Sequence, residues 1–213
     1  VTSAVAPVET LGQYFDTANS SLNPHNRGYT FYVYGTLPLF VVRYVGEWAE
    51  MTGYGDIHLV GRALSATVEL LTVLLVFLTA ERLYNRRVGV LAAAFAAVAV
   101  LPIQQSHFYT VDTFASFFMM LAFYFAVVIT TSKPRNVEQR AESREQAIVN
   151  EAGEEDFSRA NLHPSRLTSF FTHPVFWPSI LFGVVLGLAV ASKINAAPIA
   201  IVLPLAAGLF LLK

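Results

Sequence analysis

Long apolar runs separated by short polar turns constrain this chain more than any other feature. The runs that approach the length of a bilayer crossing are 62–83, 88–106, 113–131 and 175–192, with an incomplete run at 196–212. A crossing helix needs about 20 mostly apolar residues, and within lipid it must satisfy its own backbone hydrogen bonds. The chain is 54% hydrophobic and 14% charged, whereas soluble domains carry about 25% charged residues. We therefore expect an all-α fold, a polytopic transmembrane helix bundle.

A polar segment and an amphipathic segment precede the first of these runs. Residues 1–35 hold the turn-rich sequence SSLNPHNRGY and predict an outer-face loop. Residues 36–53 mix apolar residues at helical spacing with charged ones, which predicts an interfacial juxtamembrane helix. We expect Tyr44 and Trp48 of this helix to lie at headgroup depth. Three transmembrane helices are then expected within 54–131.

A charged segment separates the first three expected crossings from the last two. Residues 132–173 contain few large apolar side chains and predict a solvated cytoplasmic loop without a catalytic role. Within it, Asn136 followed by Gln139 resembles the start of a short surface helix that ends near Asn150. Residues 174–213 then supply two transmembrane helices, the last of them incomplete. Small residues in the runs permit close helix approach: Ala92, Ala93, Ala94, Ala96, Ala97, Gly183 and Gly187.

Basic residues indicate how the bundle is oriented. Arg82, Arg86 and Arg87 lie in the short turn ERLYNRR, and Lys133 and Arg135 open the charged loop. Cytoplasmic loops carry an excess of Lys and Arg, so both segments are expected on the cytoplasmic side. The turns SHFYTVD and ASKINAAP then face outward, on the same side as the N-terminal loop and the interfacial helix.

Asp112 and His107 lie in the first of these outer turns. Asp112 stands where a helix begins, and an aspartate at such a position commonly caps the free backbone N–H groups. The alternative is a functional carboxylate. His107 precedes it by five residues and is expected to form hydrogen bonds at the interface, since the sequence offers no second His or Cys at metal-ligand spacing.

Two cations stand beside or within apolar runs. Lys193 interrupts GVVLGLAVASKINAAPIAI, where a bare ammonium is unfavourable unless it reaches water or an anion. It either extends from a helix end toward water or contacts a phosphate, for which its three donors are suited. Arg62 in LVGRALSA has the same two interpretations. Glu69, seven residues later, is expected to be a neutral or paired structural acid, with Arg62 as its candidate partner.

Charge and cysteine content exclude several classes of protein. The formal net charge of -1 is not that of a nucleic-acid-binding surface, which needs clustered Lys and Arg. The absence of cysteine excludes disulfides, thiolate catalysis and Cys-ligated metals.

The chain begins without methionine and ends within an apolar run, so we expect it to be part of a longer polypeptide.

Taken in order, the segments resemble the GT-C superfamily of polytopic glycosyltransferases, of the dolichyl-phosphate-mannose and aminoarabinose transferase type. The resemblance rests on YVYGTLPLFVVRYVGEW, LVGRALSATVELLTVLLVFLTAERLYNRRVGVLAAAFAAV, SHFYTVDTFASFF and GLAVASKINAAPIAI. It implies a GT-C-like helix arrangement in a multi-pass protein of the bacterial plasma membrane. It also implies transfer of a sugar, with inversion, from a polyprenyl-phosphate donor to an acceptor hydroxyl on the outer face.

The resemblance also implies roles for individual residues. Lys193 is expected to contact the lipid phosphate. Asp112 is expected to position the acceptor or the donor headgroup, or a divalent metal in members that use one, and His107, Arg62 and Tyr109 are expected to line the same pocket. The acidic pair that such enzymes carry in their first outer loop is missing from this sequence, so the general base is expected upstream of Val1.

Two other functions fit the same features. The first is a non-catalytic membrane subunit that keeps the GT-C helix arrangement and serves assembly or lipid binding in a larger membrane complex. The second is a transporter with Lys193 and Glu69 along a pathway. The transporter is disfavoured because the sequence shows no interrupted helices in inverted repeats.

Overall fold

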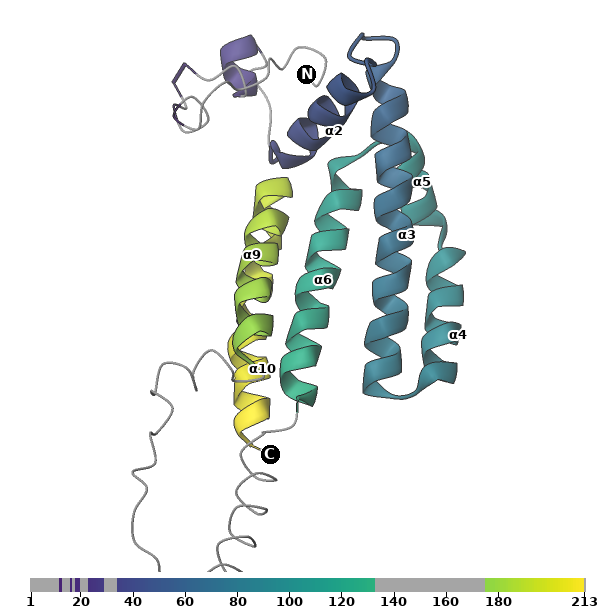
Figure 1. Ribbon diagram of the computed structural model, residues 1–213, viewed down its shortest axis with the longest axis vertical. Helices are drawn as coiled ribbons and strands as arrows, with labels where there is room; N and C mark the ends of the chain where they lie inside the picture. Colours follow the sequence, from purple (N-terminus) through teal and green to yellow (C-terminus); the bar gives the residue numbers. More distant parts are fainter. Residues whose placement is uncertain are drawn as a thin grey trace, which may run out of the picture.

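The structure is a computed structural model that describes residues 34–132 and 175–212, together with residues 12, 16, 18–19 and 23–28. Every regular element in these ranges is a helix, which confirms the all-α fold class. Figure 1 shows an array of roughly antiparallel helices with α2, Leu37–Trp48, lying across one end. A short 3-10 turn, η2, covers Pro24–Arg27. The expected surface helix at 136–150 lies outside the described residues.

Helix α2 ends in a compact turn that leads directly into the first long helix. Glu50 adopts a left-handed conformation with φ 57°, and its N–H donates to the carbonyl of Glu47. The N–H of Met51 donates to the carbonyl of Gly46 over 2.7 Å. This pair of hydrogen bonds is the Schellman arrangement, which satisfies carbonyls left free at a helix end. It lets the chain reverse direction within a few residues.

The next run forms one long helix, α3, Ile57–Leu83. The run expected as a single crossing at 88–106 instead forms α4, Arg86–Ala97, and α5, Val100–Phe108, bent by 54°. Pro102 explains the break, because its nitrogen cannot donate to the carbonyl four residues earlier and its ring collides with that group. The crossing is therefore broken near its middle.

Helix α6, Val111–Thr131, lies at the centre of the array. It packs on α3 on one side and, on the other, on α9, Phe176–Ser192, and α10, Val202–Leu211. The 3-10 helix η3, Ile194–Ile201, joins α9 to α10. The core between α6, α9 and α10 consists of small and large buried side chains: Ala122, Ala126, Ile129, Phe182, Val185 and Ala206.

Alanines, and not the glycines of α9, allow these helices to approach closely. A Cβ added at Gly183 or Gly187 would meet no described atom within 4 Å beyond the neighbouring residues and backbone of α9 itself. The expectation that these two glycines mark a close helix contact is therefore wrong for the packing described. Ala122 and Ala189 are instead fully buried.

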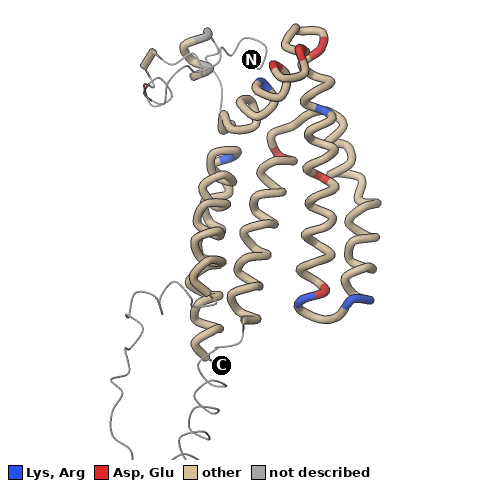
Figure 2. The backbone as a smooth tube through the Cα atoms, viewed as in Figure 1, with Lys and Arg blue, Asp and Glu red and all other residues tan. Residues whose placement is uncertain are grey.

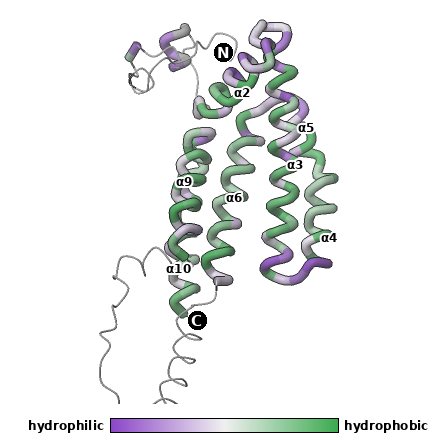
Figure 3. Tube along the Cα trace, viewed as in Figure 1, coloured by the Kyte–Doolittle hydropathy of each residue, from purple (hydrophilic) through white to green (hydrophobic). Residues whose placement is uncertain are grey.

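In the part of the chain that the structure describes, three helices are long and apolar enough to cross a membrane: α3, α6 and the continuous segment Ile194–Leu211. The bent pair α4 and α5 qualifies as a fourth if it counts as one span, and α9 is apolar but shorter. Figure 3 shows that hydrophobic residues dominate the lengths of these helices, and Figure 2 shows charged residues mostly near their ends. The chain is an integral membrane protein.

Candidate functional site

The residues singled out from the sequence gather where helices begin or end beside α2. We name this region the α2 end and define it by Arg62, His107, Asp112 and Lys193. Helix α3 begins here, α5 ends here, α6 begins here and α9 ends here (Figure 1). The topology therefore brings together side chains that are far apart in the sequence.

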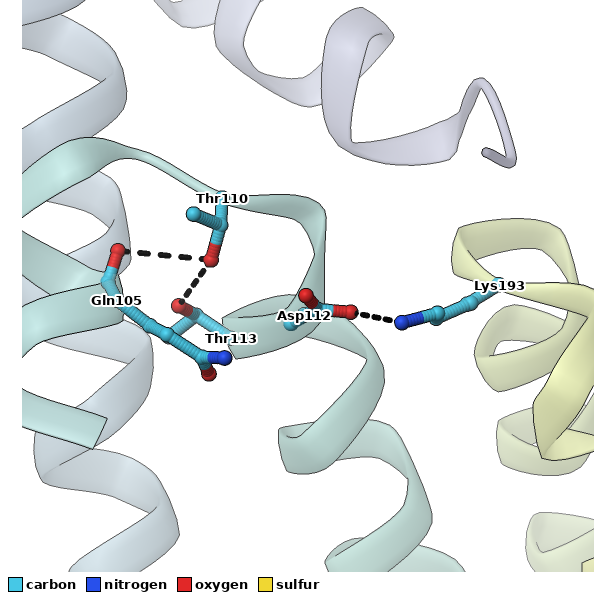
Figure 4. Close-up of polar contacts among 5 residues, drawn as sticks. All are labelled: Gln105, Thr110, Asp112, Thr113 and Lys193. Carbon is cyan, nitrogen blue, oxygen red and sulfur yellow. Dashed lines mark hydrogen bonds and ion pairs between the residues drawn. The ribbon is translucent and has the colours of Figure 1, made fainter. Parts of the chain in front are cut away.

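Asp112 and Lys193 are in direct contact, although 81 residues separate them. The Nζ atom of Lys193 lies 2.5 Å from Oδ1 of Asp112, and the two side chains are 30% and 31% exposed. Figure 4 shows the two side chains extended toward each other from the start of α6 and the end of α9. The pair is therefore partly shielded from water yet accessible from outside the bundle.

Lys193 lies at the junction between α9 and η3. Lys193 follows the last residue of α9 and has an extended backbone, φ -158° and ψ 121°. Its N–H still donates to the carbonyl of Ala189 over 2.9 Å. The residue therefore caps α9 and at the same time redirects the chain into η3.

Asp112 does not cap α6, so the capping prediction is wrong. The N-cap is Thr110, and its side chain makes no capping hydrogen bond. The Thr110 hydroxyl instead lies 3.5 Å from the backbone carbonyl of Gln105 and 3.5 Å from the hydroxyl of Thr113 (Figure 4). Asp112 lies in the first turn of the helix, where the positive end of the macrodipole stabilises a carboxylate.

Tyr34 and Gly35 adjoin Lys193 and were not predicted as site residues. Nζ of Lys193 lies 5.9 Å from the centre of the Tyr34 ring, within the range of a cation–π interaction. The N–H of Gly35 donates to the carbonyl of Ser192 over 3.1 Å. A Cβ on Gly35 would lie 1.9 Å from the carbonyl oxygen of Ala191, so only glycine fits here.

Arg62 and His107 form a second pair at the α2 end. Nη2 of Arg62 lies 2.8 Å from Nε2 of His107. A guanidinium only donates, so Nε2 accepts this hydrogen bond and the imidazole carries its proton on Nδ1. The expected pairing of Arg62 with Glu69 is therefore wrong. Within the described ranges Glu69 makes no hydrogen bond or ion pair.

Tyr109 anchors the turn between α5 and α6. It adopts a left-handed conformation with φ 54°, and its hydroxyl donates to the carbonyl of Pro38 over 3.4 Å. Its ring covers Gly61, where an added Cβ would lie 2.5 Å from Cδ1 of Tyr109. These contacts join the turn to α2 and α3, so a contact with substrate would be additional to a packing role.

A divalent metal does not fit the residues that the structure describes. No group of three or more His, Cys, Asp or Glu side chains among them is placed to hold a metal ion. Asp112 already pairs with Lys193, and His107 already accepts from Arg62.

Comparison with known proteins supports the resemblance drawn from the sequence. The family model described as dolichyl-phosphate-mannose-protein mannosyltransferase matches residues 51–137. This portion of the chain is of the GT-C type. The match includes Arg62, His107, Tyr109 and Asp112, and it ends before Lys193. No curated protein and no solved structure matches the chain. Residues 51–137 are thus GT-C glycosyltransferase-like, within a membrane protein.

Proposed function

We propose that this protein transfers a sugar from a polyprenyl-phosphate donor to an acceptor hydroxyl, with inversion at the anomeric carbon. The reaction would take place at the α2 end, on the outer face of a bacterial plasma membrane. The observation that carries the proposal is the partly exposed pair of Lys193 and Asp112. It places a cation and a carboxylate side by side at the end of an apolar bundle, in a chain whose preceding helices match the GT-C type family.

Lys193 suits the leaving group of this reaction. The acceptor oxygen attacks the anomeric carbon, and the bond from that carbon to the phosphate oxygen breaks with its electron pair on the phosphate. Negative charge therefore grows on the phosphate in the transition state. An ammonium held at that position stabilises the charge, and the effect is strongest where water is scarce. The base that accepts the hydroxyl proton is not assigned to a described residue.

The other polar residues at the α2 end have supporting roles in this proposal. Asp112 accepts hydrogen bonds from hydroxyls of the sugar or of the acceptor. Arg62 adds positive charge to the same end of the bundle, and His107 holds its guanidinium in place. Tyr109 keeps the turn that carries Asp112 against α2 and α3.

The proposal is tested by mass spectrometry of lipid-linked sugars and glycosylated products in cells with and without the gene. Deletion is expected to remove one glycosylated product and to raise the amount of its polyprenyl-phosphate-linked sugar. The wild-type gene should restore both, and a Lys193→Gln gene should not, despite equal protein in the membrane. If the deletion alters no product and no lipid-linked sugar, the enzyme proposal fails and the non-catalytic subunit is the better account.

A further inference from the structure

The pairing of Lys193 with Asp112 has a consequence for how the site binds its substrate, given the proposed function on which this inference rests. We propose that Asp112 is the resident counter-ion of Lys193, and that the phosphate of the polyprenyl donor displaces it on binding. Asp112 would then set the affinity of the site for phosphate, in addition to contacting hydroxyl groups.

The ion pair differs in kind from the other one in the described part of the chain. Arg43 and Glu47 lie four residues apart on α2, with Nε and Oε1 3.0 Å apart, as neighbours on one helix face commonly do. Lys193 and Asp112 instead join two helices that are remote in sequence. Each emerges from an apolar helix, where a cation without an anion is unfavourable. Asp112 therefore neutralises the positive charge of Lys193, as a bound phosphate could also do.

A phosphate that joins this pair is repelled by the negative charge of Asp112. The ammonium and the carboxylate together carry no net charge, so an arriving phosphate places two anions on one cation. Both side chains are only about one-third exposed, and charges shielded from water are poorly screened by salt. Repulsion between the phosphate and Asp112 therefore favours departure of the carboxylate from Nζ.

Asp112 can leave Lys193 without disturbing the fold. Among the described residues, the Asp112 side chain has one hydrogen-bond partner, Nζ of Lys193 (Figure 4). Its backbone is fixed in the first turn of α6, so rotation about the side-chain bonds is sufficient. The released carboxylate stays near the positive end of the α6 macrodipole, which stabilises it there. It is then free to accept hydrogen bonds from sugar or acceptor hydroxyls.

The same exchange favours release of the product. The donor is a phosphodiester with one negative charge, whereas the polyprenyl monophosphate left after transfer carries between about 1.5 and 2 negative charges at neutral pH. Asp112 therefore opposes the product more strongly than the donor. Its return to Lys193 restores the arrangement that the structure shows.

The test measures the binding of a short-chain polyprenyl monophosphate to the purified protein in nanodiscs of zwitterionic lipid, with the uncharged polyprenol as the control ligand. Three variants are compared with wild type: Asp112→Asn, Lys193→Gln and Glu47→Gln. Glu47→Gln is the matched control, because it removes one carboxylate from the other ion pair. Circular dichroism establishes that each variant keeps its helices.

We expect Asp112→Asn to lower the dissociation constant of the monophosphate by roughly threefold to tenfold. Glu47→Gln should leave it unchanged, and polyprenol binding should not respond to any variant. Unchanged or weaker monophosphate binding by Asp112→Asn overturns the counter-ion inference alone. Undiminished binding by Lys193→Gln overturns the phosphate contact and, with it, the proposed function.

A second measurement uses the unmodified protein, so it does not depend on how a variant folds. A carbodiimide joins a carboxylate to an amine only when the two are in contact, and the pair at 2.5 Å should yield an isopeptide between Asp112 and Lys193. Saturating polyprenyl monophosphate should lower the yield of this cross-link several-fold, whereas polyprenol should not. An unchanged yield with the monophosphate bound contradicts displacement of Asp112.

Discussion

The two ends of the helix bundle use the same kinds of charged residue in different ways. At the α2 end, Lys193 pairs with Asp112 and Arg62 with His107, and each pair joins separate helices. At the opposite end, which we name the Arg82 end after the arginine in the last turn of α3, the cations Arg86 and Arg87 are exposed and make no ion pair with described residues.

The difference separates a surface suited to an anion from a surface suited to water. Arg86 and Arg87 at the Arg82 end are exposed, and we expect them to face the cytoplasm by the positive-inside tendency. Cations at the α2 end are held by specific partners at the edge of an apolar core. The cations of the α2 end therefore depend on contacts between helices, whereas Arg86 and Arg87 at the Arg82 end depend on no specific partner among the described residues.

The largest loss of stability at the α2 end is expected from a substitution at the contact between Gly35 and α9. Gly35→Ala would place a methyl group 1.9 Å from the carbonyl oxygen of Ala191, and we expect it to lower the free energy of unfolding by about 3 kcal/mol. Thermal unfolding in detergent measures the change. Gly187→Ala is the matched control in open space, and it should be neutral or slightly stabilising. Equal stability of the two variants would contradict the close approach.

Substitutions of His107, the partner of Arg62, are expected to change the free energy of unfolding by a smaller amount. His107→Lys places two cations side by side in place of a donor and an acceptor, so we expect a loss of about 1 kcal/mol in detergent unfolding experiments. His107→Asn keeps an acceptor for the guanidinium and should stay within about 0.5 kcal/mol of wild type. If the lysine variant is as stable as the asparagine variant, Arg62 does not depend on His107.

The smallest effect is expected at the Arg82 end. The Nε of Arg82 donates to the hydroxyl of Thr131 over 2.5 Å and joins the ends of α3 and α6. Because this contact is exposed, we expect Arg82→Gln to lower the unfolding free energy by only about 0.5 kcal/mol. Arg86→Gln should have no measurable effect. A large loss from either variant would mean that this end also carries specific structure.

The local sequence was sufficient to predict the long helices, but it did not predict the contacts between them. Apolar length predicts α3 and α6, because lipid allows few alternatives to a helix. Basic residues, together with the helix order, predict that Asp112 and Lys193 lie at one end, and the structure brings them into contact. Local position alone suggested a cap at Asp112, and only the placement of α9 reveals the competing partner.

The contacts that were missed depend on atoms from distant segments. The role of Gly35 follows from the carbonyl of Ala191, and no feature of the sequence YVYGTLP indicates it. The partner of Arg62 is set by the path of α5, so helical spacing toward Glu69 was misleading. The break between α4 and α5 was signalled by Pro102, which interrupts an otherwise apolar run.

The most direct test of the proposed phosphate site is the rate of sugar transfer from a polyprenyl-phosphate donor in membranes that contain the protein. Lys193→Gln is compared with Arg86→Gln, which removes one positive charge from the opposite end of the bundle. We expect Lys193→Gln to lower the rate by about 100-fold or more and Arg86→Gln to leave it at the wild-type value. A Lys193→Gln protein that is present in the membrane and transfers sugar at the wild-type rate would contradict the account.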